Sequence, residues 1–412
     1  MALYTGAMAD SFLEKLDESN CSTRVRAALA RAREDARAFE RDPITALKAS
    51  PATAEKPSVR VAMGDPQAPL SRVLEILDRH DLLGDDGRIH PRAELVSMGD
   101  HFDWGAPDER AFAAESGYAL LAWLASHPRE QVTILVGNHD LARVGELAPF
   151  DDPDFAAARK EALALRRIPM GNPGRAERRH AFLVSHPSLP SVGVAVRDLS
   201  TFEARQRALV ETLLREGRLA AAHAAADDFL LIHAGVTPRD LEGIDYEGDL
   251  ADARAIAEAI ARVFSTAAVN WDGETPFSLL PLYRPGSYLM GESRGIFVQR
   301  PADPAVGELP LFEGPPRRRF DPRELAQGLT QATGHIRDQK CRDLMPVWSD
   351  DDPPHDGPLR HLWTNGRQVS YRRGAPPDDA GAVLLFADGG MNHARLADYE
   401  LLDLDTRRAF KP

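Results

Sequence analysis

The sequence VTILVGNHD, residues 132–140, runs a short apolar segment directly into a polar cluster. A β-branched segment of this length that ends at glycine predicts a buried strand. The pattern occurs twice earlier in the chain, where residues 59–63 run into Gly64-Asp65 and residues 94–98 run into Gly99-Asp100. Apolar residues at helical spacing separate these segments. Strands that alternate with helices indicate an α/β fold.

Two later apolar segments also end in polar residues. Residues 229–232 precede His233, and the segment from 329 onward ends at Gly334-His335. Ligands of open α/β sheets gather beyond the carboxyl ends of the strands, so these clusters are candidates for one shared site. Residues 383–387 predict a closing strand, and we interpret the following Asp388-Gly389-Gly390-Met391 as architecture.

The composition restricts the class of protein. The chain has 412 residues with 43% hydrophobic content, enough for one large domain or two modest ones. Its 50 Lys and Arg against 63 Asp and Glu give a net charge of −13, which argues against a general nucleic-acid binder. A phosphorylated substrate remains compatible with this charge, because bound divalent cations reverse the local field.

The cysteines and the apolar segments bear on location. Cys21 and Cys341 are too few for a disulfide framework and fit a reducing cytoplasm. No run of about eighteen apolar residues predicts a membrane span, and residues 1–8 lack the pattern of a secretory signal. We therefore expect a soluble cytoplasmic protein without a membrane partner.

Proline positions and changes in residue composition predict three segments of the chain. Residues 1–57 form a helical extension and linker, in which Ser22 or Thr23 caps a helix that runs through Phe39. Residues 58–412 form the main domain. Within it, residues 149–227 form a mainly helical insertion, a cap or lid, with helices expected over 155–167 and 202–225.

The polar clusters together offer carboxylates, side-chain amides and imidazoles but no thiolates. Such a mixed oxygen and nitrogen set suits Mn²⁺, Fe or Zn²⁺ better than Ca²⁺ alone. The clusters are Gly64-Asp65-Pro66-Gln67, Gly99-Asp100-His101-Phe102-Asp103-Trp104-Gly105, Gly137-Asn138-His139-Asp140, His233-Ala234-Gly235 and Gly334-His335.

Five clusters in this order resemble the motifs of the calcineurin-like metallophosphoesterases. The form His233-Ala234-Gly235-Val236 is similar to the phosphoprotein phosphatase branch and its bacterial diadenosine-polyphosphate hydrolase relatives. The resemblance runs from about Ser58 to Leu404. It implies that residues 58–412 are a catalytic domain, an αββα sandwich of two mixed sheets with flanking helices and the helical insertion.

The resemblance implies a binuclear metal centre. Asp100 would bridge the two metals, Asp65 and Gln67 would complete the first site, and the second would use the remaining ligands. Mn²⁺ is the expected metal, with Fe, Zn²⁺ or Mg²⁺ as alternatives. The implied metal ligands are Asp65, Gln67, Asp100, Asn138, His233 and His335.

The resemblance also implies which residues are catalytic. His139 would act as general acid, oriented by Asp103, while a metal-bridging hydroxide attacks phosphorus. The implied function is a metal-dependent phosphoric ester hydrolase, a phosphatase acting on a phosphorylated small molecule or a phosphoprotein.

The chain departs from the family pattern at three positions. Gln67 and Arg337 replace histidines that many relatives supply to the first metal, so we expect that site to be the weaker one and to favour Mn²⁺ or Mg²⁺. Trp104 stands where protein phosphatases have a phosphate-binding arginine. Arg300, Arg143 and Arg337 are the candidates to bind the substrate phosphate instead.

Two alternatives stay open from the sequence. One is a phosphodiesterase or nucleotide pyrophosphohydrolase that uses the same metals on a larger substrate. The other is a degenerate, non-catalytic protein that binds a phosphorylated ligand, an alternative kept open by Gln67 and Trp104. The sequence leaves the substrate, the native metals, the oligomeric state and the role of the insertion undetermined.

Overall fold

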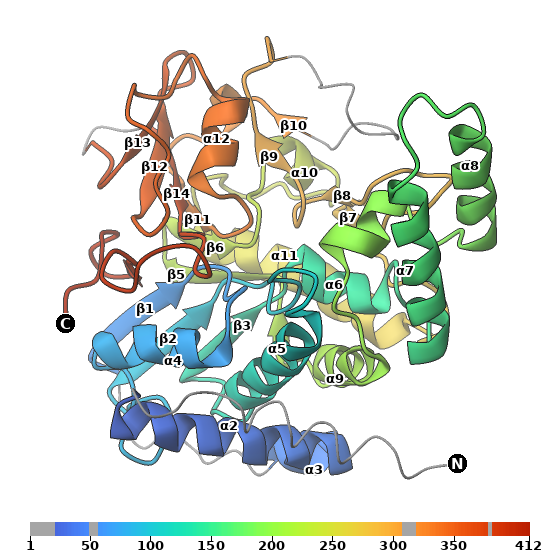
Figure 1. Ribbon diagram of the computed structural model, residues 1–412. Coiled ribbons are helices and arrows are strands. Elements are labelled where there is room, and N and C mark those ends of the chain that lie inside the picture. The colour runs from blue at the N-terminus through green and yellow to red at the C-terminus, as the bar shows by residue number, and fades with distance from the viewer. Residues whose placement is uncertain (1–20, 49–56, 307–318, 378–380) are drawn as a thin grey trace.

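Two mixed β-sheets lie face to face, and helices cover their outer faces (Figure 1). This architecture is that of a computed structural model that describes residues 21–48, 57–306, 319–377 and 381–412. The start of the chain and residues 49–56 of the predicted linker lie outside the described residues. The mixed α/β class expected from the sequence is confirmed.

The first sheet has five strands in the order β15-β1-β2-β3-β4. Its strands are parallel except for β15, which is antiparallel to β1. Three of the four parallel strands end at polar clusters that the sequence predicted. The strands are β1 (Val59–Met63), β2 (Ala93–Ser97), β3 (Val132–Leu135), β4 (Leu219–Ala220) and β15 (Leu402–Asp403).

The second sheet has six strands in the order β13-β12-β14-β11-β6-β5. Its three central strands β14, β11 and β6 are parallel, and the outer pairings are antiparallel. The strands are β5 (Ala222–Ala226), β6 (Phe229–Ile232), β11 (Thr330–Thr333), β12 (Arg360–Thr364), β13 (Val369–Arg373) and β14 (Ala382–Phe386). Short pairs join β7 (Tyr283–Arg284) to β8 (Arg294–Gly295) and β9 (Arg300–Pro301) to β10 (Arg319–Phe320).

Alternation of side chains along the strands produces the layers. Ala62 and Leu135 of the first sheet share one buried cluster with Leu231 and Leu385 of the second, so the two sheets pack on each other. The intervening residues point outward: Val61, Leu95 and Ile134 belong to the cluster that includes the helices, and Leu384 and Phe386 pack in a fourth cluster. The arrangement has four layers.

Helices α2 (Thr23–Arg41), α4 (Leu70–Arg79), α5 (Arg110–Ala125) and α9 (Ala204–Arg215) lie on the outer side of the first sheet (Figure 1). Helix α11 (Ala253–Asn270) packs beside β5 and β6 of the second sheet, and α12 (Asp338–Leu344) shares a buried cluster with β12, β13 and β14. Ser22 caps α2 by accepting the N–H of Val25. Shorter helical segments are α3 (Pro43–Lys48), α6 (Asn138–Val144), α10 (Pro238–Glu242) and η3 (Pro322–Glu324).

A small second core lies beside α6 (Figure 1). It contains α7 (Asp152–Arg166), α8 (Arg175–Ser185) and the π-helical turn η2 (Val194–Asp198). Its buried residues extend to Phe202. The remainder of the predicted insertion packs elsewhere, because α9 joins the main core and β4 and β5 are edge strands of the two sheets.

The helix expected over residues 202–225 is wrong in its second half. Helix α9 ends at Arg215, Gly217 has a φ of +61°, and the alanine-rich residues that follow form β4 and β5. Alanine favours helix, but backbone pairing with β3 and β6 outweighs that intrinsic preference.

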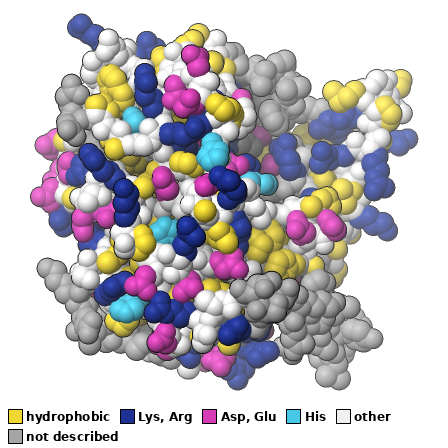
Figure 2. Space-filling model, turned by 60° about the vertical axis from the view of Figure 1, so that its left-hand side comes forward, with side chains coloured by type: hydrophobic (Ala, Val, Ile, Leu, Met, Phe, Trp, Pro, Cys, Tyr) yellow, Lys and Arg dark blue, Asp and Glu magenta, His cyan; other side chains and the backbone are white. Residues whose placement is uncertain are grey.

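Among the described residues, no helix combines the length and the apolar character needed to cross a bilayer. Basic and acidic side chains are interspersed over the face shown in Figure 2. That face therefore lacks the continuous basic surface that binding of a nucleic-acid backbone requires.

Candidate metal centre

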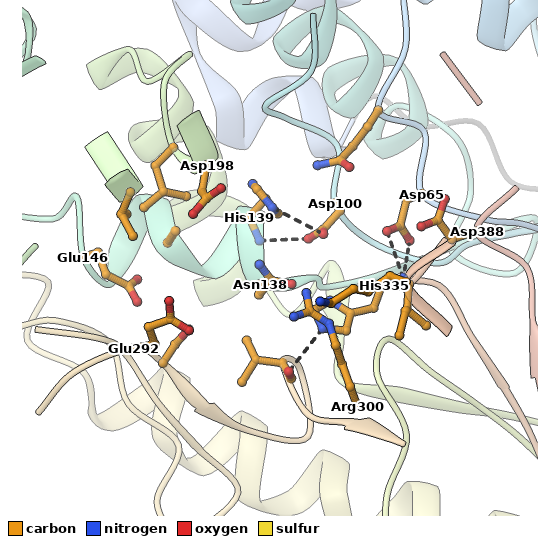
Figure 3. Close-up of a pocket in the computed structure, with 18 of the residues that line it drawn as sticks. Asp65, Asp100, Asn138, His139, Glu146, Asp198, Glu292, Arg300, His335 and Asp388 are labelled. Atoms are coloured by element: carbon orange, nitrogen blue, oxygen red, sulfur yellow. Dashed lines mark hydrogen bonds and ion pairs between the residues drawn. The ribbon is translucent and has the colours of Figure 1, made fainter. Parts of the chain in front are cut away.

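Polar residues from both sheets meet where the parallel strands end. Asp65 follows β1, Asp100 follows β2 and Asn138 follows β3, while His233 and His335 follow β6 and β11 of the other sheet. Asp65, Asp100, Asn138 and His335 line one cavity of about 270 Å³, together with Gln67 and His139. Side chains that are up to 270 positions apart in the chain are thus brought together (Figure 3).

Two glycines make this approach possible. A Cβ atom on Gly137 would lie 2.1 Å from a carboxylate oxygen of Asp100, and one on Gly334 would lie 1.9 Å from a carboxylate oxygen of Asp65. Both distances are far below van der Waals contact. These two glycines therefore leave the space that an acidic side chain occupies, from the neighbouring strand for Gly137 and from the other sheet for Gly334.

The tightest group of candidate ligands contains Asp100, His233 and His335, whose ligand atoms lie within 4.8 Å of one another. Nδ1 of His233 lies 2.8 Å from the carbonyl of Met98, so its Nε2 atom faces Asp100 at 3.4 Å. Nε2 of His335 lies 3.2 Å from the carbonyl of Val298. Backbone carbonyls orient ligating imidazoles in this way in metal sites.

Asn138 and Gln67 complete the set of amides. The side-chain oxygen of Asn138 lies 3.3 Å from Nε2 of His233. Gln67 donates its amide N–H to the carbonyl of Phe102 at 2.8 Å, which leaves its own carbonyl oxygen for the cavity. Both residues, predicted as ligands from the sequence, thus lie at the cavity.

Asp65 and Asp388 are buried beside Asp100. Burial raises the pKa of Asp65 well above its ordinary value, and the nearby carboxylates of Asp388 and Asp100 raise it further. Burial also raises the pKa of Asp388. Three crowded carboxyl groups with oxygen and nitrogen donors around them fit divalent cations, whose charge relieves the repulsion.

Asp100 differs from its two neighbours. Burial opposes its ionisation, but His233 and His139 hold its pKa below the ordinary range. One of its oxygens accepts the backbone N–H of His139 at 2.8 Å. The other oxygen lies 3.4 Å from Nε2 of His233, so the two oxygens face different groups.

The imidazole of His139 is held in place through its Nδ1 atom. Its Nδ1 lies 2.9 Å from Asp103, whose second oxygen accepts both the backbone N–H and the hydroxyl of Thr201 at 3.0 and 2.7 Å. Burial lowers the pKa of His139, but Asp100 and the hydrogen bond to Asp103 outweigh it and raise the pKa to about 9. The Nε2 atom is left facing the cavity and Asp100, 3.9 Å from its carboxylate.

The three predicted phosphate-binding arginines are placed differently. Arg300 and Arg337 line the cavity. Arg143 is fully buried and lies behind the site, where it donates to Asp103 at 2.5 Å and to the carbonyl of His139 at 3.0 Å. Its guanidinium therefore holds the His139–Asp103 pair and does not line the cavity.

Sequence reasoning missed five charged residues of the cavity, Asp198 and Glu292 among them. Asp388 was interpreted as architecture, although it follows β14 as the other acids follow their strands. Lys340 lies on α12, and Glu146 lies just beyond α6; both line the cavity. No local motif marks Lys340 or Glu146, although they follow His335 and His139 by only five and seven positions.

A second cavity of about 230 Å³ shares Asp65, Gln67, Arg337 and Asp388 with the first. Its remaining walls include Trp104, whose ring packs edge-on against Phe112 at 5.6 Å. The shared carboxylates are thus open on two sides.

Neither comparison with known proteins places the chain: no protein-family model matches it, and no curated protein does.

Proposed function

We propose that this chain is a metal-dependent hydrolase of phosphoric esters, of the calcineurin-like type that its motifs resemble. The observation that carries the proposal is the convergence of Asp65, Asp100, Asn138 and His335 on one cavity, with His233 directly behind. The four layers agree with the αββα sandwich that the resemblance implies.

The residues present suit two divalent cations. Asp65, Gln67 and Asp100 would hold the first, and Asp100, Asn138, His233 and His335 the second. Asp388 lines the cavity beside the first site and adds a third carboxylate there. When bound, such cations lower the pKa of a shared water and neutralise phosphoryl oxygens.

The remaining chemistry belongs to side chains of this chain. His139, held at Nδ1 by Asp103, presents Nε2 to the cavity and donates a proton to the leaving oxygen. Arg300, Arg337 and Lys340 line the same cavity, and their positive charges favour a phosphate there. Arg143 keeps Asp103 ionised and in place, since its positive charge lowers the pKa of that buried carboxyl group against the effect of burial.

The second cavity favours one alternative. It gives room on another side of Asp65 and Asp388 for a further ester substituent. A phosphodiesterase or nucleotide pyrophosphohydrolase would use that room, whereas a phosphomonoesterase would not.

A substrate comparison tests the proposal. The full chain, loaded with Mn²⁺, is assayed with p-nitrophenyl phosphate, bis-p-nitrophenyl phosphate and a diadenosine polyphosphate. We expect hydrolysis of the monoester; preferential hydrolysis of the other two would select the diesterase or pyrophosphohydrolase. If the folded protein hydrolyses none of these substrates with Mn²⁺, Fe²⁺, Zn²⁺ or Mg²⁺, the proposal is wrong and the alternative of a non-catalytic phosphate-ligand binding protein is favoured.

A further inference from the structure

The cavity at the candidate metal centre is lined by further charged side chains beyond the candidate ligands. Arg300, Arg337 and Lys340 lie in the part of the chain that surrounds β9 and α12. An acidic wall is formed by Asp198, from the second core, with Glu146 and Glu292 (Figure 3). Figure 3 places these three carboxylates on one side of His139 and Asn138, and Asp65 and Asp388 on the opposite side.

Glu146 is the best-defined residue of this acidic wall. It is only 4% exposed, and one of its oxygens accepts the N–H of Gly286 at 2.6 Å. The other oxygen is buried and has no hydrogen-bond partner. A buried carboxylate with an unsatisfied oxygen is costly, which indicates that a donor from a ligand completes it. Burial raises the pKa of this group to about 7.

The neighbours of Glu146 add negative charge. The carboxyl groups of Glu146 and Glu292 point toward one another in Figure 3. Asp198 also lines the cavity and is paired with Arg197 at 2.7 Å. Both oxygens of Asp198 accept from the Arg197 guanidinium, at 2.7 and 3.1 Å, so Glu146 and Glu292 carry the negative charge of this part of the cavity.

A metal ion does not fit this wall well. Among the described residues, Asp100, His233 and His335 form the group whose ligand atoms converge within 4.8 Å, and the three wall carboxylates do not. Carboxylates with wider spacing suit a larger cation with several N–H donors. Ala142, Val194 and Leu199 also line the cavity, and their apolar side chains suit an apolar spacer in the ligand.

We propose that the cavity binds phosphate esters whose leaving group carries an ammonium or guanidinium group, held by Glu146 with Glu292. The inference rests on the proposed hydrolase function and names its substrate class. Water adds to phosphorus, the ester P–O bond breaks, and the products are inorganic phosphate and a cationic alcohol that receives its proton from His139.

The test compares esters that differ in charge alone. The Mn²⁺-loaded full chain is assayed at pH 8 with aminoalkyl phosphates of increasing chain length and with uncharged alkyl phosphates of matched size. We expect kcat/KM to favour the amine at the best length by about tenfold or more. Glu146→Gln should bring this ratio close to one, whereas Glu258→Gln, on the exposed side of α11, should leave it unchanged. If Glu146→Gln does not fold, the half-buried Glu292 supplies a second variant, Glu292→Gln, whose ratio should also fall.

Three outcomes overturn the inference. If the protein hydrolyses p-nitrophenyl phosphate but shows no preference for aminoalkyl over alkyl phosphates, the inferred substrate class is wrong and the proposed function stands. An equal loss of kcat/KM for amine and alkyl esters in Glu146→Gln assigns Glu146 a structural role. Absence of hydrolysis of every ester removes the proposed function and this inference with it.

Discussion

Oδ2 of Asp103 lies 2.9 Å from Nδ1 of His139 and accepts a hydrogen bond from Arg143 at 2.5 Å. One buried carboxylate therefore joins the imidazole to a buried guanidinium. Because Thr201 binds the other oxygen of Asp103, the carboxylate has little freedom to turn, and the imidazole is held with Nε2 toward the cavity.

Removal of the His139 imidazole tests its role as proton donor. We expect His139→Ala to lower kcat for an alkyl phosphate by about 10²- to 10⁴-fold. The loss should be smaller for p-nitrophenyl phosphate, because nitrophenolate leaves without a proton. Steady-state kinetics with both esters measures the difference. His355→Ala, which lies outside both cavities, is the control; an equal loss for both leaving groups in His139→Ala would contradict the assignment.

The two metal sites are expected to differ in affinity. Calorimetric titration of the metal-free protein with Mn²⁺ should show two unequal binding events, because the first site has no imidazole. His233→Ala should abolish the tighter event, since His233 lies among the closest group of ligand atoms. Gln67→His should tighten the weaker event and shift it toward Zn²⁺. Two equal, tight events in the unaltered protein would refute the difference.

The space beside Gly137 is expected to be essential to the site. A Cβ at this position would lie 2.1 Å from Asp100, so Gly137→Ala must displace that carboxylate. We predict a loss of metal affinity of roughly tenfold to a hundredfold, similar to other changes that reorient ligands. Gly171→Ala is the matched control, because no atom lies within 4 Å of its Cβ position. Calorimetry that gives the same affinity for both variants would count against the geometry.

Glu146 is expected to lower stability as the pH rises from about 4.5 to 7. Its pKa of about 7 in the folded protein lies above the ordinary 4.5, so the native state keeps a proton that the unfolded chain has released. The free energy of unfolding therefore falls as the pH rises from about 4.5 to 7. Glu146→Gln removes this titration, and its stability relative to the unaltered chain should rise by about 1 to 3 kcal/mol between pH 5 and pH 8.

Urea unfolding of both proteins at the two pH values measures this change. Glu258→Gln, at an exposed position, should show the same pH dependence as the unaltered chain. An unchanged difference between Glu146→Gln and the unaltered chain at pH 5 and pH 8 would show that the carboxyl group titrates normally.

The strand ends could be predicted from the sequence because two local signals coincide there. A buried strand requires an apolar run, as in Phe229–Ile232, and a polar residue such as His233 marks the point where the strand leaves the core. The predicted ends of the strands before Asp65 and His233 agree with the structure to the residue. The signal failed where alanine dominates, because β5 takes its conformation from pairing with β6 rather than from its own residues.

Residues that reach the site from behind or across the cavity could not be predicted. Arg143 was expected to bind phosphate because it follows His139. It lies one helical turn after His139 on α6, and its side chain contacts Asp103 instead of lining the cavity. Glu146 has an ordinary sequence context, and its unusual surroundings come from Gly286, which is 140 positions away. Such positions depend on packing between segments that are distant in the chain.

The backbone N–H of His335 contacts both carboxylate oxygens of Asp65, at 3.0 and 2.9 Å, and this contact crosses from one sheet to the other. Neither sheet forms the cavity alone, since the cavity exists only when the two sheets are packed together. A cation bound there contacts ligands from both sheets and therefore opposes their separation. Occupancy of the site and folding of the protein are thus thermodynamically linked.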